Sequence, residues 1–216
     1  MRDQYQQQLD SVLDELVEMT GDVRAALSSA TQALLDADIS SAEAVITGDL
    51  AIDDARERIE EDSFDILARQ SPVAGDLRML VASLRMVADL ERMGDLSVHI
   101  AKVARLRYPT AAVPDVFIPT IQQMAKTADE MIMAAAEIVA SHDVEAARAL
   151  EAADDDMDRL RRSMFRTLLS DDWADGVEPA VDMALIGRYY ERIGDHAVSM
   201  ARRIVFLVTG HHPAGV

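Results

Sequence analysis

Two short motifs of the same form stand 100 residues apart, each pairing a glutamate with an aspartate four positions later. Residues 91–95 read Glu-Arg-Met-Gly-Asp and residues 191–195 read Glu-Arg-Ile-Gly-Asp. On an α-helix this spacing brings two side chains to one face, with about 5–6 Å between their Cβ atoms. Two carboxylates that close repel each other unless a proton, an arginine or a bound cation compensates their charge. Each motif is therefore a candidate cation site.

Each motif is preceded in the chain by another acid pair with the same spacing, Asp49 with Asp53 and Asp154 with Asp158. These two pairs are 105 residues apart. All four pairs interrupt stripes of apolar residues at helical spacing. Glu91, for example, stands where a stripe through Val87 and Gly94 requires an apolar side chain. The glycine of each motif would also let a facing helix approach closely beside the acids. The eight candidate metal ligands are Asp49, Asp53, Glu91, Asp95, Asp154, Asp158, Glu191 and Asp195.

Oxygen-only ligands favour Mg²⁺, Mn²⁺, Ca²⁺ or iron over zinc in a thiolate or imidazole site. Two other interpretations stay open. The first is a purely structural bundle in which arginines pair with the acids, and the candidates are Arg56, Arg85, Arg161 and Arg188. The second is a metal-dependent enzyme, either a phosphohydrolase or a carboxylate-bridged oxidase. The oxidase would need a Glu-x-x-His sequence, which is absent, and no base or phosphate clamp is visible for the hydrolase. We therefore expect a protein that is not an enzyme.

The elements that carry these acids are predicted to be helices, because apolar residues recur at steps of three and four throughout the chain. Asp38 and Asp143 are expected to cap the helices that follow them. Ser71 is expected to cap the third helix, with Pro72 at its first position, and Gly210 to end the last. The predicted helices span residues 3–37, 40–69, 73–107, 115–141, 143–171 and 177–209.

The internal repetition divides these helices into three plus three. We predict an all-α fold of two tandem, pseudo-symmetric three-helix bundles. The first bundle spans residues 1–108 and the second 115–210, with a linker at 109–114 and a C-terminal tail at 211–216.

The composition restricts the choice of partners and compartment. The 216-residue chain carries 39 acidic and 21 basic side chains, a net charge of −18. Such a charge repels nucleic acid and anionic lipid, so we expect neither as a ligand. The chain has no cysteine, and its polar N-terminus lacks the apolar segment of a signal peptide. We expect a cytoplasmic protein.

The motif at 91–95 and its repeat resemble the PhoU family of regulatory and accessory proteins of phosphate uptake. Residues 67–78 (Leu-Ala-Arg-Gln-Ser-Pro-Val-Ala-Gly-Asp-Leu-Arg) resemble the family's turn into its third helix, and residues 88–95 its most recognisable stretch. The second copy departs from this pattern at residues 171–176. The resemblance covers the whole chain and implies two three-helix bundles, often dimeric. It also implies metal clusters held by Glu/Asp-x-x-x-Asp motifs, which here fall on the eight acids already named.

The resemblance further implies a regulatory role. Members couple the ATPase subunit of the phosphate ABC transporter to a sensor histidine kinase, and keep phosphate-starvation genes off when phosphate is plentiful. The expected protein is thus a homodimeric adaptor and negative regulator of the phosphate regulon, peripheral to the membrane only through its partners. Its metal is left open among iron, manganese, magnesium and zinc.

Overall fold

The computed structural model describes residues 2–211, with side chains from Tyr5 onward, and this part of the chain is helical apart from its connections. The predicted all-α class is confirmed. The predicted tail at 211–216 lies outside the described residues except for His211. The helices are α1 (Arg2–Asp36), α2 (Ile39–Gln70), α3 (Ala74–Arg107), the 3₁₀ turn η1 (Asp115–Phe117), α4 (Ile118–Ser141), α5 (Val144–Leu168) and α6 (Val177–Thr209).

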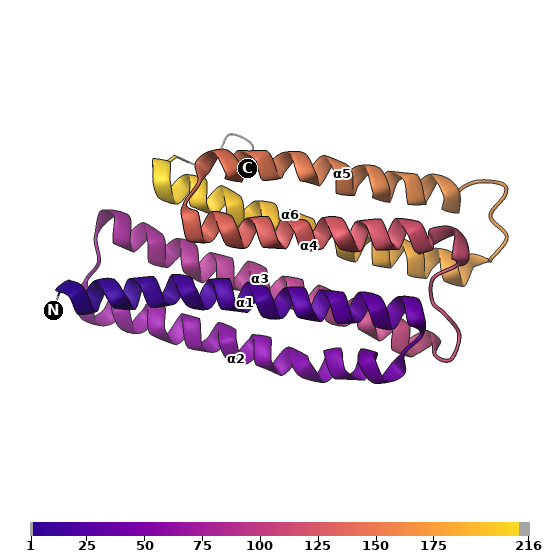
Figure 1. The fold of residues 1–216 in the computed structure, drawn as a ribbon, viewed down its shortest axis with the longest axis horizontal. Coiled ribbons are helices and arrows are strands. Elements are labelled where there is room, and N and C mark those ends of the chain that lie inside the picture. Colours follow the sequence, from indigo (N-terminus) through magenta and orange to yellow (C-terminus); the bar gives the residue numbers. More distant parts are fainter. Residues whose placement is uncertain (1, 212–216) are drawn as a thin grey trace.

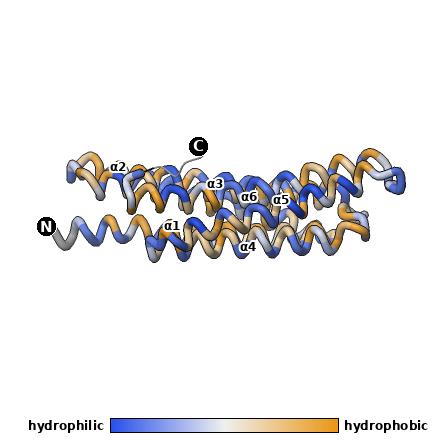
Figure 2. The backbone as a smooth tube through the Cα atoms, turned by 90° about the horizontal axis from the view of Figure 1, so that it is seen from above, coloured by the Kyte–Doolittle hydropathy of each residue, from blue (hydrophilic) through white to orange (hydrophobic). Residues whose placement is uncertain are grey.

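The six helices form two three-helix bundles that lie side by side (Figure 1). Within the first bundle α1, α2 and α3 pack on one another, and α4, α5 and α6 do the same in the second. The bundles meet where α3 packs against α6 and α1 against α4. Seen from above, α1 and α4 make one layer, and the other four helices make a second layer (Figure 2). The contacts give this second layer the order α2, α3, α6, α5.

Burial in the interior follows the helical stripes that the sequence predicts, with exceptions at the helix ends. Leu80 and Val87 of α3 and Ile193 of α6 are fully buried, and each such side chain contributes about 1.5–3 kcal/mol to folding. At the starts of α3 and α6, however, Leu77 and Val177 are exposed. The predicted stripe is therefore incomplete in the first turn of each of these two helices.

The predicted helix caps are confirmed at matching positions of the two copies. The side chain of Asp38 accepts hydrogen bonds from the backbone N–H groups of Ser40 and Ser41, at 2.9 and 3.2 Å. Asp143 does the same for Glu145 and Ala146, at 2.9 and 3.0 Å. These bonds satisfy backbone donors that the first turn of a helix leaves without partners. Gly210 ends α6 in a left-handed conformation, with φ of 73°, as predicted.

Three predicted boundaries are wrong. Ser71 does not cap α3; it closes α2 in a left-handed conformation (φ 48°, ψ 55°), and α3 begins at Ala74 without a side-chain cap. The fourth helix starts at Ile118 rather than 115, because residues 115–117 form a 3₁₀ turn ahead of Pro119. The fifth ends at Leu168 rather than 171, where a turn leads to Trp173. Local sequence favoured helix in these places, but the chain must reverse direction between packed helices.

Polar contacts, one of them fully buried, tie the two bundles together. The hydroxyl groups of Tyr190 on α6 and Thr31 on α1 are 2.7 Å apart, and Tyr190 is fully buried. At the end of α3, Arg107 bonds both carboxylate oxygens of Asp182 on α6, at 2.6 and 3.1 Å. The relative position of the bundles is therefore set by directional bonds as well as by apolar packing.

Across residues 2–211, none of the helices combines the length and the apolar character that crossing a bilayer requires.

Replacing Tyr190 with phenylalanine should lower the free energy of unfolding by about 1 kcal/mol, because the buried bond to Thr31 is lost while the ring stays. The Thr31 hydroxyl also donates to the carbonyl of Leu27, at 2.8 Å, so Tyr190 is its donor. Urea denaturation measures the change. Tyr189→Phe is the matched control, since that neighbouring ring stacks on His99 without a bond from its hydroxyl. Equal losses in both variants would contradict the role of the bond.

Candidate functional site

The four acids of the first copy meet between α2 and α3. Asp49 and Asp53 lie on α2, and Glu91 and Asp95 lie on α3. Burial, and then the negative charges of Asp95 and Asp53, raises the pKa of Asp49. Burial also raises the pKa of Glu91, against the opposing charge of Arg92. Acids from two helices thus share one electrostatic site, as their spacing predicts.

The second copy repeats this arrangement between α5 and α6. Burial raises the pKa of Asp154 to about 6, and the charges of Asp195, Asp158 and Glu191 add to the effect. Glu191 is itself buried, with 8 % of its surface exposed. The structure therefore brings the predicted acids together in two groups. We call them the first cluster (Asp49, Asp53, Glu91, Asp95) and the second cluster (Asp154, Asp158, Glu191, Asp195).

The motif glycines allow this close approach. A Cβ atom on Gly94 would lie 3.1 Å from Cδ1 of Ile52 and 3.5 Å from Oδ1 of Asp49. A Cβ atom on Gly194 would lie 3.2 Å from the sulfur of Met131 and 3.6 Å from Oδ1 of Asp154. In each copy, the first aspartate therefore sits directly over the glycine of the facing motif, as expected from the sequence.

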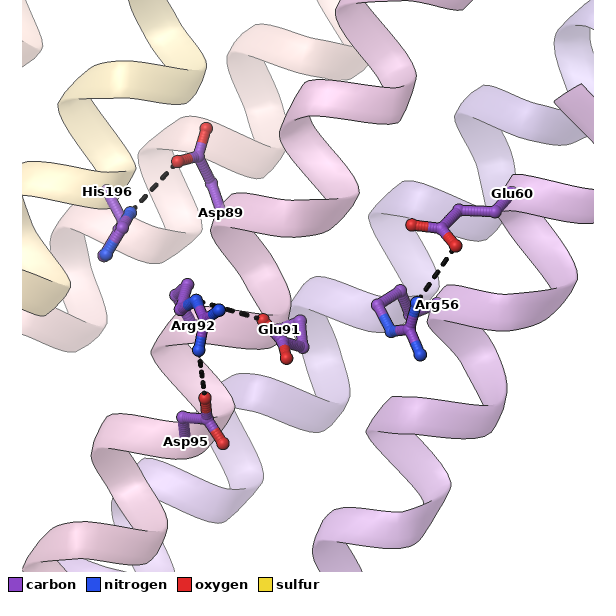
Figure 3. A network of polar contacts seen from close by, with 7 residues as sticks. All are labelled: Arg56, Glu60, Asp89, Glu91, Arg92, Asp95 and His196. Atoms are coloured by element: carbon purple, nitrogen blue, oxygen red, sulfur yellow. Dashed lines mark hydrogen bonds and ion pairs between the residues drawn. The ribbon is translucent and has the colours of Figure 1, made fainter.

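Arginine partners differ between the two clusters. In the first, Arg92 reaches Asp95 at 2.9 Å and Glu91 at 3.5 Å, whereas Arg56 turns away to Glu60 at 3.0 Å (Figure 3). The predicted pairing of Arg56 with the cluster is not formed, and Arg85 makes no ion pair in the described part of the chain.

In the second cluster, the arginines named as structural partners do pair. Arg161 lies 3.4 Å from Glu191, and Arg188 also bonds Glu191. Arg162 bonds Asp158 at 3.0 Å. The glutamate of this cluster is thus neutralised by protein, and Asp154 is not.

Three acids have no direct bond to another protein group, although Lys102 and His99 partly offset the charge of Asp49. Within residues 2–211, no ion pair or hydrogen bond reaches the side chains of Asp49, Asp53 or Asp154. Their oxygens are suited to a hard cation, which would relieve the repulsion that raises the pKa of Asp49 and Asp154. No group of three or more potential ligands in this part of the chain converges on one point. Binding an ion therefore requires the carboxylates to rotate toward one another.

A polar network in the contact between α3 and α6 was not predicted. Asp89, 7 % exposed, accepts from Nε of Arg203 at 2.9 Å and lies 3.0 Å from Nδ1 of His196 (Figure 3). The position that corresponds to Asp89 in the second copy is Tyr189, so repetition offered no signal for it. His99 stacks on Tyr189, with ring centroids 5.4 Å apart. His196 is thus held by a buried carboxylate and His99 by a ring contact.

A groove of about 1030 Å³ lies elsewhere, between α4 and α5. Ala and Leu side chains, with Met131 and Ile138, line much of it. None of the eight acids lines it, so its size does not bear on the two clusters.

Known proteins of the same architecture place this chain in a family. The model of the PhoU domain family matches residues 16–104 and 121–204. The chain belongs to the PhoU family. The two matched segments correspond to the two bundles, although the predicted limits of the linker stay a prediction.

Other PhoU proteins match the chain over its full length. It is 45% identical over 213 residues to the phosphate-specific transport system accessory protein PhoU homolog 2 of Mycobacterium tuberculosis, which covers 99% of this chain and 100% of that protein. It is 44% identical to PhoU homolog 1 of Mycobacterium leprae, over 99% of this chain and 96% of that protein. The crystal structure of PhoU from Pseudomonas aeruginosa matches with a TM-score of 0.88 at 29% identity, covering 96% of this chain and 100% of that one.

Replacing Asp154 with asparagine should stabilise the protein in the presence of chelator. A raised pKa means that folding favours the protonated acid, so ionisation costs stability as the pH rises from about 4 to about 6. After discounting for solvent screening, the gain at neutral pH should be about 1 kcal/mol, and it should shrink toward pH 4. Urea denaturation at both pH values measures it. Asp171→Asn, at an exposed loop position, is the control, and a gain independent of pH would contradict the electrostatic cause.

Proposed function

We propose that this chain is a negative regulator of the phosphate regulon that also modulates phosphate ABC transport. It would act as an adaptor between the ATPase subunit of the transporter and a sensor histidine kinase, and not as an enzyme. The observation that carries this proposal is similarity over the full chain to proteins named as accessory to the phosphate-specific transport system. The acidic surface, with a net charge of −18, suits docking onto basic patches of such partners.

The proposal includes a metal site in each copy. Asp49, Asp53, Glu91 and Asp95 would hold one cation or cluster, and Asp154, Asp158, Glu191 and Asp195 the other. Two observations support this proposal. The carboxylates of Asp49, Asp53 and Asp154 have no ion pair in the described residues, and Asp49 and Asp154 lie over the motif glycines. Because the donors are all oxygen, magnesium, manganese and iron suit them better than zinc. A cation there would cross-link α2 to α3 and α5 to α6, with a stabilising effect on each bundle.

The same acids could serve a metal-dependent hydrolase, but their surroundings favour the adaptor. Glu191 is held by Arg161 and Arg188, and Asp95 by Arg92. Carboxylates paired in this way are poor general bases, because the proton they would accept competes with a guanidinium. We further propose a homodimer and a cytoplasmic location, in keeping with partners on the inner side of a transporter.

Metal content is the first test. Protein purified at neutral pH without chelator should carry bound iron, manganese, magnesium or zinc, measured by elemental analysis. Replacing Glu91 and Glu191 with alanine together should lower that content about tenfold or more, because each cluster loses an oxygen donor. The control is Glu43→Ala with Asp171→Ala, at exposed positions outside both clusters, which changes the net charge by the same amount. Metal-free wild-type protein would support the purely structural bundle instead.

Gene expression is the second test. In a host strain lacking every PhoU-family gene, phosphate-starvation genes should be expressed even in high phosphate, and this chain should restore repression. Reporter activity from a starvation promoter measures it. The Glu91→Ala, Glu191→Ala double variant should restore repression less well than the exposed-site control if metal matters to the signal. Normal repression in the empty strain would contradict the regulatory role.

A further inference from the structure

A small cavity opens in the contact between α3 and α6, between the two acid clusters. Its volume is about 190 Å³. Four of its six lining residues are arginine or histidine, in a chain whose acids outnumber its bases by 39 to 21. The lining residues are Arg92, Asp95, Leu96, His99, Arg192 and His196.

The two arginines are the second residues of the repeated motifs. In each motif the glutamate and aspartate belong to a cluster, and the arginine lines the cavity where α3 meets α6, together with Asp95 of the first motif. Packing α3 against α6 therefore brings Arg92 and Arg192, 100 residues apart in sequence, to the walls of one cavity. The motif arginines are not among the ligands of the metal proposal.

The charge of Arg192 is not used by the protein. No carboxylate forms an ion pair with it anywhere in residues 2–211, although this chain is rich in acids. Arg92 is shared, since it bonds Asp95 at 2.9 Å and Glu91 at 3.5 Å. The cavity thus holds one unpaired guanidinium and one that bridges to the first cluster.

The two imidazole rings are held in place by their neighbours. His196 is fixed through Nδ1 by the buried carboxylate of Asp89, which leaves its Nε2 edge for another partner. His99 is fixed by stacking on Tyr189. Leu96, 8 % exposed, supplies an apolar wall between them. The part of the cavity made by His196 and Leu96 is therefore formed before any ligand enters, whereas the exposed side chains of Arg92 and Arg192 would become ordered on binding.

We propose that this cavity binds inorganic phosphate. Guanidinium groups present forked N–H donors that match the oxygens of a tetrahedral oxyanion. At about 30 Å³ per water molecule, the volume suits such an ion with a few waters and is below that of sites for drug-sized ligands. The net charge of −18 does not forbid this, because charges beyond about 8 Å are screened at physiological salt.

The carboxylate of Asp95 selects phosphate over sulfate. Phosphate at neutral pH keeps at least one P–OH group, which donates a hydrogen bond to a carboxylate or to an unprotonated imidazole nitrogen. Sulfate has no proton to donate and meets only repulsion from Asp95. A cavity with two arginines and one acceptor carboxylate therefore distinguishes a protonated oxyanion from an unprotonated one.

This inference deepens the proposed function by assigning phosphate a site on the regulator itself. It also connects that site to the metal proposal, since a cation that takes up Glu91 and Asp95 would release Arg92 toward the cavity. Coupling of this kind is reciprocal, so each ligand should strengthen binding of the other.

Isothermal titration calorimetry of the full chain tests the site directly. Chelator-treated wild-type protein at low ionic strength should bind sodium phosphate, with sodium sulfate weaker by about tenfold or more. The Arg92→Gln, Arg192→Gln double variant should lose about tenfold or more of the phosphate affinity, because both forked donors are removed. The matched control is Arg105→Gln with Arg166→Gln, two exposed arginines without ion pairs, which should bind like wild type. Circular dichroism checks that each variant is folded.

The outcomes separate the two proposals. No phosphate uptake by the wild type, uptake equal in the cavity variant, or an equal loss in the control variant would each overturn the site. Sulfate binding as tightly as phosphate would overturn the role given to Asp95 and with it the assignment to phosphate. Repeating the titration with magnesium should raise the phosphate affinity. Phosphate binding without any effect of magnesium supports the cavity and counts against the metal proposal.

Discussion

The packing of α3 against α6 is the constraint on which the rest of the structure depends. Each of these helices carries a Glu-Arg-x-Gly-Asp motif, and each is flanked on its other side by a helix that carries two more aspartates. When α3 and α6 pack together, the acids of both motifs meet those of the outer helices α2 and α5, and the two arginines, with Asp95, line one cavity between the bundles. One interface therefore places two acid clusters and one basic cavity side by side.

The acid clusters are stabilised only in part by the protein. Gly94 and Gly194 bring an aspartate of the facing helix close enough that burial and mutual repulsion raise its pKa. Surrounding arginines compensate Glu191 and Asp95, but leave Asp49, Asp53 and Asp154 without an ion pair in the described residues. Burying unpaired carboxylates costs free energy that apolar residues at the same positions would not. A cost of this kind is present in both copies, and a bound cation, as proposed above, would offset it.

Membership of the PhoU family and the electrostatics of the fold give two separate kinds of evidence about function. Similarity to accessory proteins of phosphate transport points to a regulator, while the charges describe what such a regulator could detect. In the two proposals above, the acid clusters hold cations and the cavity between them holds an anion. Asp95 belongs to both the first cluster and the cavity, and Arg92 of the cavity bonds it at 2.9 Å. Binding of a cation at the first cluster would thus change the affinity of the cavity for an anion, and the reverse, through Arg92 and Asp95.

The sequence by itself determined the helical class, the duplication, the caps at Asp38 and Asp143 and the identity of the eight acids. These depend on spacing within one helix, or on comparison of the two copies, and both can be read from the letters. Only the tertiary structure decided which charges meet. Arg56 bonds Glu60 on its own helix rather than a cluster acid, which its spacing alone did not reveal. The bond between Asp89 and His196, and the cavity shared by Arg92 and Arg192, depend on α3 meeting α6, about 100 residues further along the chain. The acids were found because burial on one helix face leaves a periodic pattern, whereas an arginine at the edge of that face leaves none until the neighbouring helix is in place.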